Sequence, residues 1–237
     1  MRAVTLLAWL LWHAGAVQAQ DIPHNRLTTE ERAAGWQLLF DGVSTNGWLE
    51  VTGRPFPRNS WTIEDKCLKA FPGPQGNQDI RTTGTYVWFE LQFAWRILKD
   101  GNSGVKYLVQ NTDRWTNAKG LQARARGPEY QLVDDAGPDA SDATRVTGSL
   151  YSVLAPFERP SRPPSEWNQS RLVVSGDSVE HWLNGVRVLA YSLRQPEVIE
   201  LLRQHRKGTD VVRASPICLQ NHGTPVWFRD LKIRVLK

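Results

Sequence analysis

The residues of this sequence that are best suited to chemistry lie in two short polar clusters. In the first, residues 129–132, an extended chain turns Tyr130 and Leu132 toward a core and leaves Glu129 and Gln131 together on the opposite face. A carboxylate can move a proton, and a neighbouring amide can hydrogen-bond the charge that develops. Glu129 is therefore a candidate acid or base, and Gln131 a candidate binding residue.

The second cluster, residues 217–222, follows the same alternation. Ile217 and Leu219 take the core side of a strand, so Gln220 and His222 share the other side. A sheet face that carries a carboxylate, amides and an imidazole differs from the lysines, threonines and glutamates of an ordinary solvated face. His222 is the second candidate acid or base, and Gln220 is a second amide for binding. The structural alternatives are a surface ion pair for Glu129 and a turn hydrogen bond for His222.

Other residues are candidates for substrate binding, and each has a structural alternative. Arg229 could join the polar face, but Phe228 and Leu231 can both face inward only with a bulge at Asp230, which leaves the direction of Arg229 open. The remaining candidates, with their alternatives, are Asn102 (a simple turn), Tyr151 (a core aromatic), Trp167 (core packing) and Asn168 (a loop hydrogen bond).

The elements that must position these residues are mostly strands. Alternating apolar residues from Tyr86 to Ile97 predict a long strand with one face on a core, and Asn184-Gly185 predicts a hairpin turn. Many short strands separated by Gly, Asp and Pro indicate a sandwich or barrel. Further strands are expected at 36–40, 61–64, 104–109, 129–133, 147–151, 168–174, 178–183, 186–190, 215–220 and 226–235.

Two helices and two long loops interrupt this pattern. A capping box formed by Thr28 and Glu31 predicts a short helix over residues 29–34, and Pro196 begins a second helix that extends to Arg206. Residues 111–128 and 155–167 are expected to form long loops. Loops of this length are either functional rims or surface decoration.

Short motifs along the chain resemble, in order, those of the 3-keto-disaccharide hydrolase domain family. They are Gly35-Trp36, Leu39–Gly42, Gly47-Trp48, Trp61–Asp65, Phe89–Leu91, Gly101–Gly104, Glu129–Gln131, Gly148–Tyr151, Glu166–Asn168, Leu183–Gly185, Leu219–Gly223 and Val226–Leu231. The sequence departs from the family pattern at Lys66-Cys67, where a glycine usually follows the aspartate, and in the extra length of residues 111–128.

The resemblance implies an all-β fold, a concanavalin A-like jelly-roll sandwich of two antiparallel sheets, with one curved sheet carrying a ligand groove. It also implies a glycoside substrate whose ring is oxidised to a ketone at carbon 3. The ketone acidifies the C2 proton, so one base can start elimination of the group on C1, and water then adds to the enone. Glu129 or His222 would be base and acid, with Gln131, Gln220 and Arg229 binding the oxyanion. No cofactor is required, although a divalent cation could replace the donors.

Other functions also fit parts of the sequence. A non-catalytic, lectin-like glycan-binding module could stack sugars on exposed tryptophans such as Trp88, Trp115 or Trp167. A conventional glucanase needs a carboxylate pair across the scissile bond, and no such pattern is present on one strand. A structural or adhesion domain would more readily present an apolar surface than this polar one.

The N-terminus has the pattern of an export signal. Residues 1–19 have a charged start, a short apolar run and a small-residue end, so we expect cleavage after Ala19 and an exported protein, periplasmic or secreted. A lead-in over 20–34 and one domain over 35–237 follow, with no membrane segment expected after cleavage. The formal net charge of +5 is scattered, which argues against nucleic-acid binding and leaves carbohydrate as the expected partner. The oligomeric state is open. Cys67 and Cys218 could form a disulfide or remain buried thiols.

Overall fold

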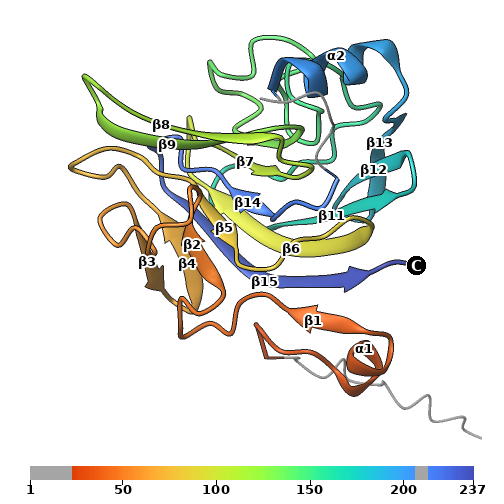
Figure 1. Ribbon diagram of the computed structural model, residues 1–237, viewed down its shortest axis with the longest axis horizontal. Helices are drawn as coiled ribbons and strands as arrows, with labels where there is room; N and C mark the ends of the chain where they lie inside the picture. Colours follow the sequence, from red (N-terminus) through yellow and green to blue (C-terminus); the bar gives the residue numbers. More distant parts are fainter. Residues whose placement is uncertain (1–22, 206–212) are drawn as a thin grey trace, which may run out of the picture.

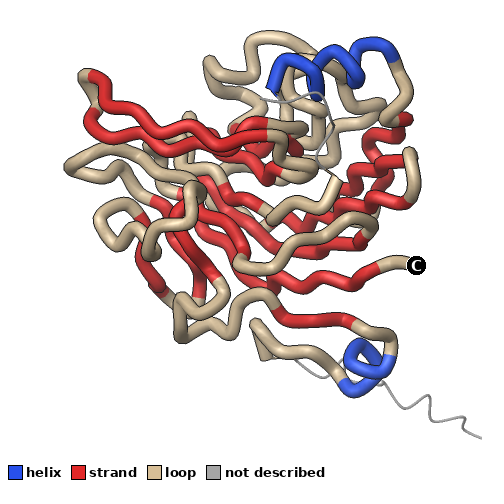
Figure 2. The backbone as a smooth tube through the Cα atoms, viewed as in Figure 1, coloured by secondary structure: helices blue, strands red, loops and turns tan. Residues whose placement is uncertain are grey.

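A computed structural model describes residues 23–205 and 213–237 of the chain, and it consists of two antiparallel sheets packed face to face (Figure 1). Strands make up most of the regular structure in Figure 2, and two short helices occur among the described residues. The predicted concanavalin A-like sandwich is confirmed. The expected signal segment, residues 1–19, lies outside the described residues. Within the described part, no helix is long and apolar enough to cross a bilayer.

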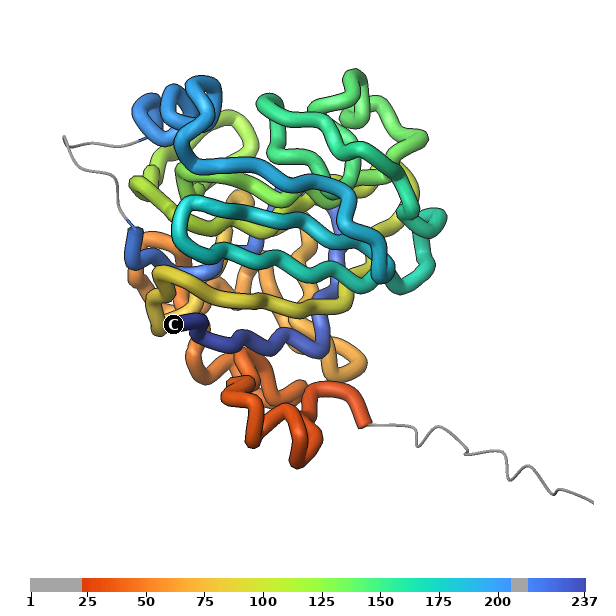
Figure 3. Tube along the Cα trace, turned by 90° about the vertical axis from the view of Figure 1, so that its right-hand side faces the viewer, coloured from red at the N-terminus to blue at the C-terminus, as the bar shows by residue number. Residues whose placement is uncertain are grey.

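The large sheet has eight strands, and those over residues 168–192, 89–97 and 226–235 run side by side in Figure 3. Its order is β13 (Val186–Ser192), β12 (Ser178–Leu183), β11 (Asn168–Ser175), β6 (Phe89–Ile97), β15 (Val226–Val235), β4 (Cys67–Ala70) and β3 (Trp61–Glu64), with β1 (Trp36–Leu38) paired to β15. The hairpin at Asn184 joins β12 to β13, as the sequence predicts, and Asn184 has the positive φ of 49° that this turn requires.

The small sheet has five strands and carries a two-stranded ribbon on its outer side (Figure 1). The order is β10 (Glu129–Val133), β7 (Asn102–Lys106), β14 (Cys218–Leu219), β5 (Ile80–Thr82) and β2 (Trp48–Glu50). The ribbon is formed by β8 (Asn111–Asn117) and β9 (Gly120–Arg126). The expectation of an irregular loop over residues 111–128 was therefore wrong. Ala123 and Ala125 allow the ribbon to lie close to the sheet, where they pack with Val51, Val109 and Cys218.

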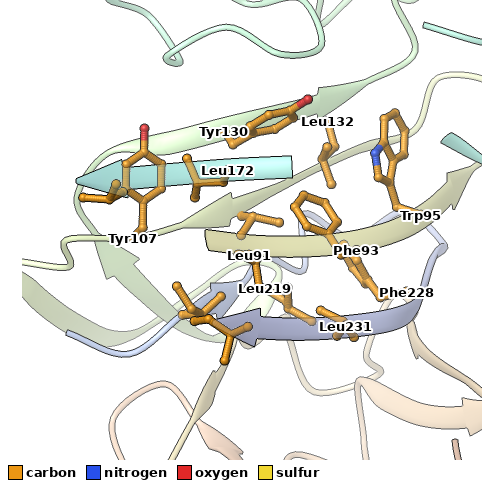
Figure 4. Packing of buried hydrophobic residues seen from close by; sticks show 14 of the residues in the cluster. Leu91, Phe93, Trp95, Tyr107, Tyr130, Leu132, Leu172, Leu219, Phe228 and Leu231 are labelled. Carbon is orange, nitrogen blue, oxygen red and sulfur yellow. The ribbon is translucent and has the colours of Figure 1, made fainter. Parts of the chain in front are cut away.

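The core lies between the inner faces of the two sheets and is filled by the alternating residues of their strands (Figure 4). From the large sheet, β6 contributes Leu91, Phe93 and Trp95, each at most 3% exposed. From the small sheet, Tyr130 and Leu132 on β10 are fully buried. The apolar residues that alternate along the sequence are therefore the residues that face the core in the structure.

A bulge near the middle of β15 determines which of its side chains face the core. The pairing of β15 with β6 shifts register between Arg229 and Lys232, and Asp230 has a φ of 54°. As a result, Phe228 and Leu231 are both fully buried. The asparagine Asn25 of the lead-in fixes this bulge, because its side-chain oxygen accepts a 2.9 Å hydrogen bond from the Asp230 backbone N–H.

The helices are close to their predicted bounds. Helix α1 covers Thr29–Ala33 with the predicted capping box, and α2 covers Pro196–His205. The strand expected at residues 147–151 is absent among the described residues, where only isolated bridges at Leu150 occur. The short strands β2, β4 and β5 and the two longer strands of the ribbon, β8 and β9, were not predicted.

The two cysteines lie in different sheets, Cys67 on β4 and Cys218 on β14. Both are free and buried, so the disulfide alternative was wrong and the buried-thiol alternative holds. Burial raises the pKa of the Cys67 thiol to about 11, and it raises the pKa of Cys218 further. Both thiols therefore act as small apolar side chains.

Candidate functional site

A cavity of about 680 Å³ opens on the outer face of the small sheet. Strands β7, β10 and β14 form its floor, while the β8–β9 ribbon and helix α2 form walls above that face (Figure 1). Six residues singled out from the sequence line it together: Asn102, Glu129, Gln131, Tyr151, Gln220 and His222. Both polar clusters therefore lie on one face of the small sheet, away from the core, as the alternation of side chains along their strands predicted.

Glu129 lies on the floor directly over Gly104. The two residues are on the neighbouring strands β10 and β7, and a Cβ built at Gly104 would lie 2.1 Å from Glu129 Oε1. Only glycine leaves room for this carboxylate. The alternative of a simple turn at residues 102–104 was wrong, because this segment belongs to strand β7, inside the sheet. Since Gly104 has no side chain, it leaves space for the carboxylate of Glu129.

Lys106 is the charged partner of Glu129, and the sequence analysis did not select it. Its Nζ lies 3.3 Å from Glu129 Oε2 and donates a 3.1 Å hydrogen bond to the carbonyl oxygen of Ala125. Lys106 lies two and four residues after Gly104 and Asn102 on the same strand, so its side chain points to the same face of the sheet. This alternation could have identified it from the sequence. The ion pair considered for Glu129 therefore exists, but it is buried and not on the surface.

Burial raises the pKa of Glu129 above its ordinary value, and the negative charge of Asp79 adds to this effect. The cations Lys106 and Arg124 oppose the shift by stabilising the ionised carboxylate. The result is a carboxylate that is a stronger base than an exposed glutamate. Positive charge from Lys106 lies beside the same carboxylate, at the place where a general base would act.

Asp79 connects the floor to the ribbon. It is fully buried and accepts hydrogen bonds of 3.1 Å from Arg124 Nη1, the Ala125 N–H and the Asn221 N–H. Its Oδ2 lies 3.9 Å from Lys106 Nζ. This one carboxylate therefore holds the ribbon, the segment that follows β14 and the cavity-floor residue Lys106 in a fixed arrangement.

Three amide side chains lie beside the carboxylate. Gln131 Nε2 donates a 3.3 Å hydrogen bond to Asn102 Oδ1, and Asn102 Nδ2 donates one of 2.6 Å to Asp139. The buried Oε1 atoms of Gln131 and Gln220 have no hydrogen-bond partner among the described residues. Buried polar atoms are rarely left without a partner, so these two oxygens are suited to accept hydrogen bonds from a polar ligand.

His222 lies at the exposed side of the cavity. Its pKa is lowered, chiefly because the surrounding protein partly shields the ring from water, while the carboxylate of Asp139 opposes the shift. The neutral imidazole can donate one hydrogen bond and accept another. Tyr151 forms a neighbouring part of the wall, and its N–H donates a 3.1 Å hydrogen bond to the backbone oxygen of Glu129.

The walls contain cavity residues that were not among the site candidates. Trp115 and Arg126 come from the ribbon; Trp115 was considered only as a sugar-stacking tryptophan of a lectin-like module, and Arg126 was missed because residues 111–128 were expected to be a loop. Glu197, Glu200, Gln204 and His205 come from helix α2. Their spacing of three and four residues along the helix puts them on one face, and this periodicity was the available signal.

Three candidates lie elsewhere. The guanidinium of Arg229 lies 3.8 Å from the ring centroid of Trp167 and belongs to β15 of the large sheet, so both fall outside the cavity lining. Asn168 is 1% exposed, and its Oδ1 accepts hydrogen bonds from the Arg162 N–H and from Asn184 Nδ2. Arg229 and Trp167 stack on each other and Asn168 fixes a loop, so the structure does not bring these three candidates to the cavity that contains Glu129.

Across residues 23–205 and 213–237, no group of three His, Cys, Asp or Glu side chains has the arrangement of a metal site. Asp134 and Asp135, the acidic pair between β10 and the following loop, are used in backbone hydrogen bonds. Asp134 Oδ2 accepts from the Asp100 N–H at 2.9 Å, and Asp135 Oδ1 accepts from the Thr147 N–H at 2.7 Å.

The sequence and the fold are similar to those of known proteins. A domain family described as 3-keto-alpha-glucoside-1,2-lyase-like matches residues 35–234, a range that contains every residue lining the cavity. A 3-keto-disaccharide hydrolase from Bacteroides thetaiotaomicron is 32% identical over 232 residues, covering 86% of this chain and 79% of the relative.

Solved structures agree in fold. A crystal structure described as a candidate glycosyl hydrolase from Parabacteroides distasonis has 29% identity and a TM-score of 0.76, and the match covers 91% of this chain and 100% of that one. A second structure from the same organism, with the same description, has 23% identity and a TM-score of 0.59, covering 81% of this chain and 100% of that chain. At that identity the second match supports the fold alone.

Proposed function

From the premise that the chain belongs to the 3-keto-alpha-glucoside-1,2-lyase-like domain family and has a glycoside hydrolase-type function, we propose that its substrate is a glycoside with a ketone at carbon 3. The relative from Bacteroides thetaiotaomicron is named for 3-keto-disaccharides, and the match covers most of both chains. The cavity supports the same class of substrate, because amides, cations and aromatic rings surround a single buried carboxylate.

The first step is removal of the C2 proton by Glu129. The ketone at C3 acidifies this proton, and the electron pair of the C2–H bond moves onto the ketone oxygen as an enolate. The observation that carries the proposal is the position of Glu129, buried on the cavity floor with a raised pKa and with Lys106 Nζ 3.3 Å away. Lys106 and Arg124 supply positive charge to the same region, where it stabilises the enolate oxygen.

In the second step the enolate electrons return to form the C1–C2 double bond, and the glycosidic oxygen leaves C1. This oxygen needs a proton, which Glu129 has just received and can return directly or through His222. Water then adds to C1 of the enone while C2 regains a proton. The sum of these steps is hydrolysis of one glycosidic bond, with no net oxidation or reduction.

The test is turnover of a 3-keto-disaccharide, followed as release of the keto-monosaccharide. Glu129→Gln should abolish product release and also the exchange of the C2 proton in deuterated water, because both need the carboxylate. Glu166→Gln is the matched control, since Glu166 is an exposed carboxylate outside the cavity lining. Normal rates in Glu129→Gln would remove the assignment of the base.

His222→Ala separates proton delivery from binding. A disaccharide needs a proton on its leaving oxygen, whereas a 4-nitrophenyl 3-keto-glucoside has a leaving group that departs as an anion. If His222 delivers the proton, the variant should lose activity on the disaccharide and keep it on the nitrophenyl substrate. Equal losses on both substrates would instead assign His222 to binding.

We also propose that the protein is exported and acts in the periplasm or outside the cell. The support is the pattern of residues 1–19, a short charged start followed by an apolar run and small residues. Expression of the full chain, cell fractionation and N-terminal sequencing test this proposal. The expected mature end is Gln20, and an intact Met1 in the cytoplasmic fraction would contradict it.

A further inference from the structure

The cavity is larger than one sugar ring needs. Its volume of about 680 Å³ is in the middle of the ~300–1,000 Å³ range of ligand sites. The keto sugar must lie on the floor, because its C2 proton has to reach Glu129. The leaving sugar, attached through the C1 oxygen, must then lie toward the walls that rise from the small sheet.

Two aromatic side chains line the cavity, Tyr151 and Trp115, and they come from different parts of the fold. Tyr151 is next to the base, because its N–H bonds the backbone oxygen of Glu129. Trp115 lies on the ribbon, two residues before the end of β8 at Asn117. Tyr151 therefore belongs to the region of the keto sugar, and Trp115 is the aromatic ring of the upper wall.

The ring of Trp115 is held in place but accessible. The Arg126 guanidinium lies 5.5 Å from its centroid, and Arg126 Nε donates a 2.7 Å hydrogen bond to Asp113 Oδ2. Trp115 remains 39% exposed, and its Nε1 donates to no residue of the described part of the chain. A fixed, accessible indole with a free N–H suits the C–H face and the hydroxyl groups of a sugar.

Helix α2 offers an independent polar group to the same region. His205 Nδ1 is buried and has no hydrogen-bond partner among residues 23–205 and 213–237. His205 lines the cavity and interacts electrostatically with both Arg126 and Lys106, which places it between the ribbon and the floor. A buried nitrogen without a partner is an expected position for a ligand hydrogen bond.

We propose that Trp115 is the binding platform for the leaving sugar and that His205 binds a hydroxyl of the same sugar. This inference rests on the proposed function, and it assigns substrate specificity to the upper wall and chemistry to the floor. The enzyme should therefore distinguish a sugar leaving group from a small alcohol through Trp115, without any change in the machinery at Glu129.

The test compares two substrates, a 3-keto-disaccharide and a methyl 3-keto-glucoside, in wild-type protein and in Trp115→Ala. The variant should raise KM for the disaccharide about tenfold or more, as expected for loss of a central aromatic contact, and leave kcat/KM for the methyl glycoside unchanged. His205→Ala should show the same selectivity. Trp88→Ala is the matched control, because Trp88 is 41% exposed and lies outside the cavity lining, and it should change neither substrate.

The outcomes separate this inference from the proposed function. If Trp115→Ala leaves the disaccharide KM unchanged, or raises KM for both substrates equally, the assignment of the leaving-sugar platform is overturned while the proposed function stands. If wild-type protein turns over neither substrate, the proposed function fails and this inference with it. A thermal melt of each variant, together with Trp115→Phe as a conservative replacement that should recover part of the lost affinity, excludes misfolding as the cause.

Discussion

Lys106 and Glu129 face each other across neighbouring strands, with 3.3 Å between Lys106 Nζ and Glu129 Oε2, and both side chains are buried. They are direct register partners of β7 and β10, so the sheet itself fixes their separation. A buried charge without a partner is costly, and this pairing is what allows an ionisable base to remain on the cavity floor.

The first prediction concerns pH. Glu129 must be ionised to act as a base, and its pKa is raised by burial, so the acid limb of kcat/KM should lie above the ordinary glutamate value of about 4.3. Lys106 lowers this pKa, so Lys106→Met should move the limb to higher pH and reduce kcat about a hundredfold. An acid limb that stays in place in Lys106→Met would show that another group is the base.

The second prediction concerns Gly104. Alanine at this position puts a Cβ 2.1 Å from Glu129 Oε1, and the carboxylate, as the end of a flexible side chain, can move aside while the strand remains. Gly104→Ala should therefore fold normally and lose about a hundredfold in kcat/KM, because the base is displaced by an ångström or more. The measurement pairs a thermal melt with the turnover assay. A large fall in melting temperature would mean that the glycine serves the strand instead.

The third prediction concerns Asp79. Asparagine in its place removes the charge opposite Arg124 and presents an amide donor to backbone N–H groups, so Asp79→Asn should lower the free energy of unfolding by about 3 kcal/mol. Urea unfolding measures this change. Asp142→Asn is the control, since Asp142 forms an exposed pair with Arg145 that should contribute little. Equal effects of the two substitutions would contradict a special role for Asp79.

The fourth prediction concerns His181, which is buried in the core. Its Nε2 is 2.7 Å from Tyr107 Oη and its Nδ1 is 2.9 Å from the Gly148 oxygen. Burial lowers its pKa from 6.5 to about 4. The unfolded chain therefore binds the proton more readily, and stability should fall as the pH drops from 6.5 toward 4, by roughly 3 kcal/mol in total. His181→Asn should flatten this part of the stability curve, and an unchanged slope would assign the loss to other groups.

Local patterns in the sequence determined much of the fold. Alternation along residues 86–97 and 226–235 predicted long strands, and the Asn184-Gly185 turn predicted the hairpin that follows β12. The bulge at Asp230 was the condition for Phe228 and Leu231 to face inward together, and the structure has it. These features depend on neighbours within one strand or turn, which is why they can be read from the chain.

Strand parity also predicted the face shared by Glu129, Gln131, Gln220 and His222, because the side of a sheet on which a residue lies depends only on its place in the alternation. The short strands at residues 48–50 and 80–82 were missed, since three residues carry too little periodicity to be recognised. The ribbon at residues 111–126 was missed as well. Most of its residues are polar, and the two alanines that pack it on the small sheet, Ala123 and Ala125, give no recognisable core pattern in the sequence.

Only the tertiary structure decided which of the polar residues meet. Lys106 and Glu129 are more than twenty positions apart in the sequence, and their contact arises from the register of β7 against β10. Arg229 has suitable chemistry, yet it belongs to the large sheet and stacks on Trp167. The sequence by itself set the strands and the face of each side chain, since these follow from local periodicity. Sheet order and register determined which of these side chains meet in the cavity, and both depend on packing between segments that are distant in the sequence.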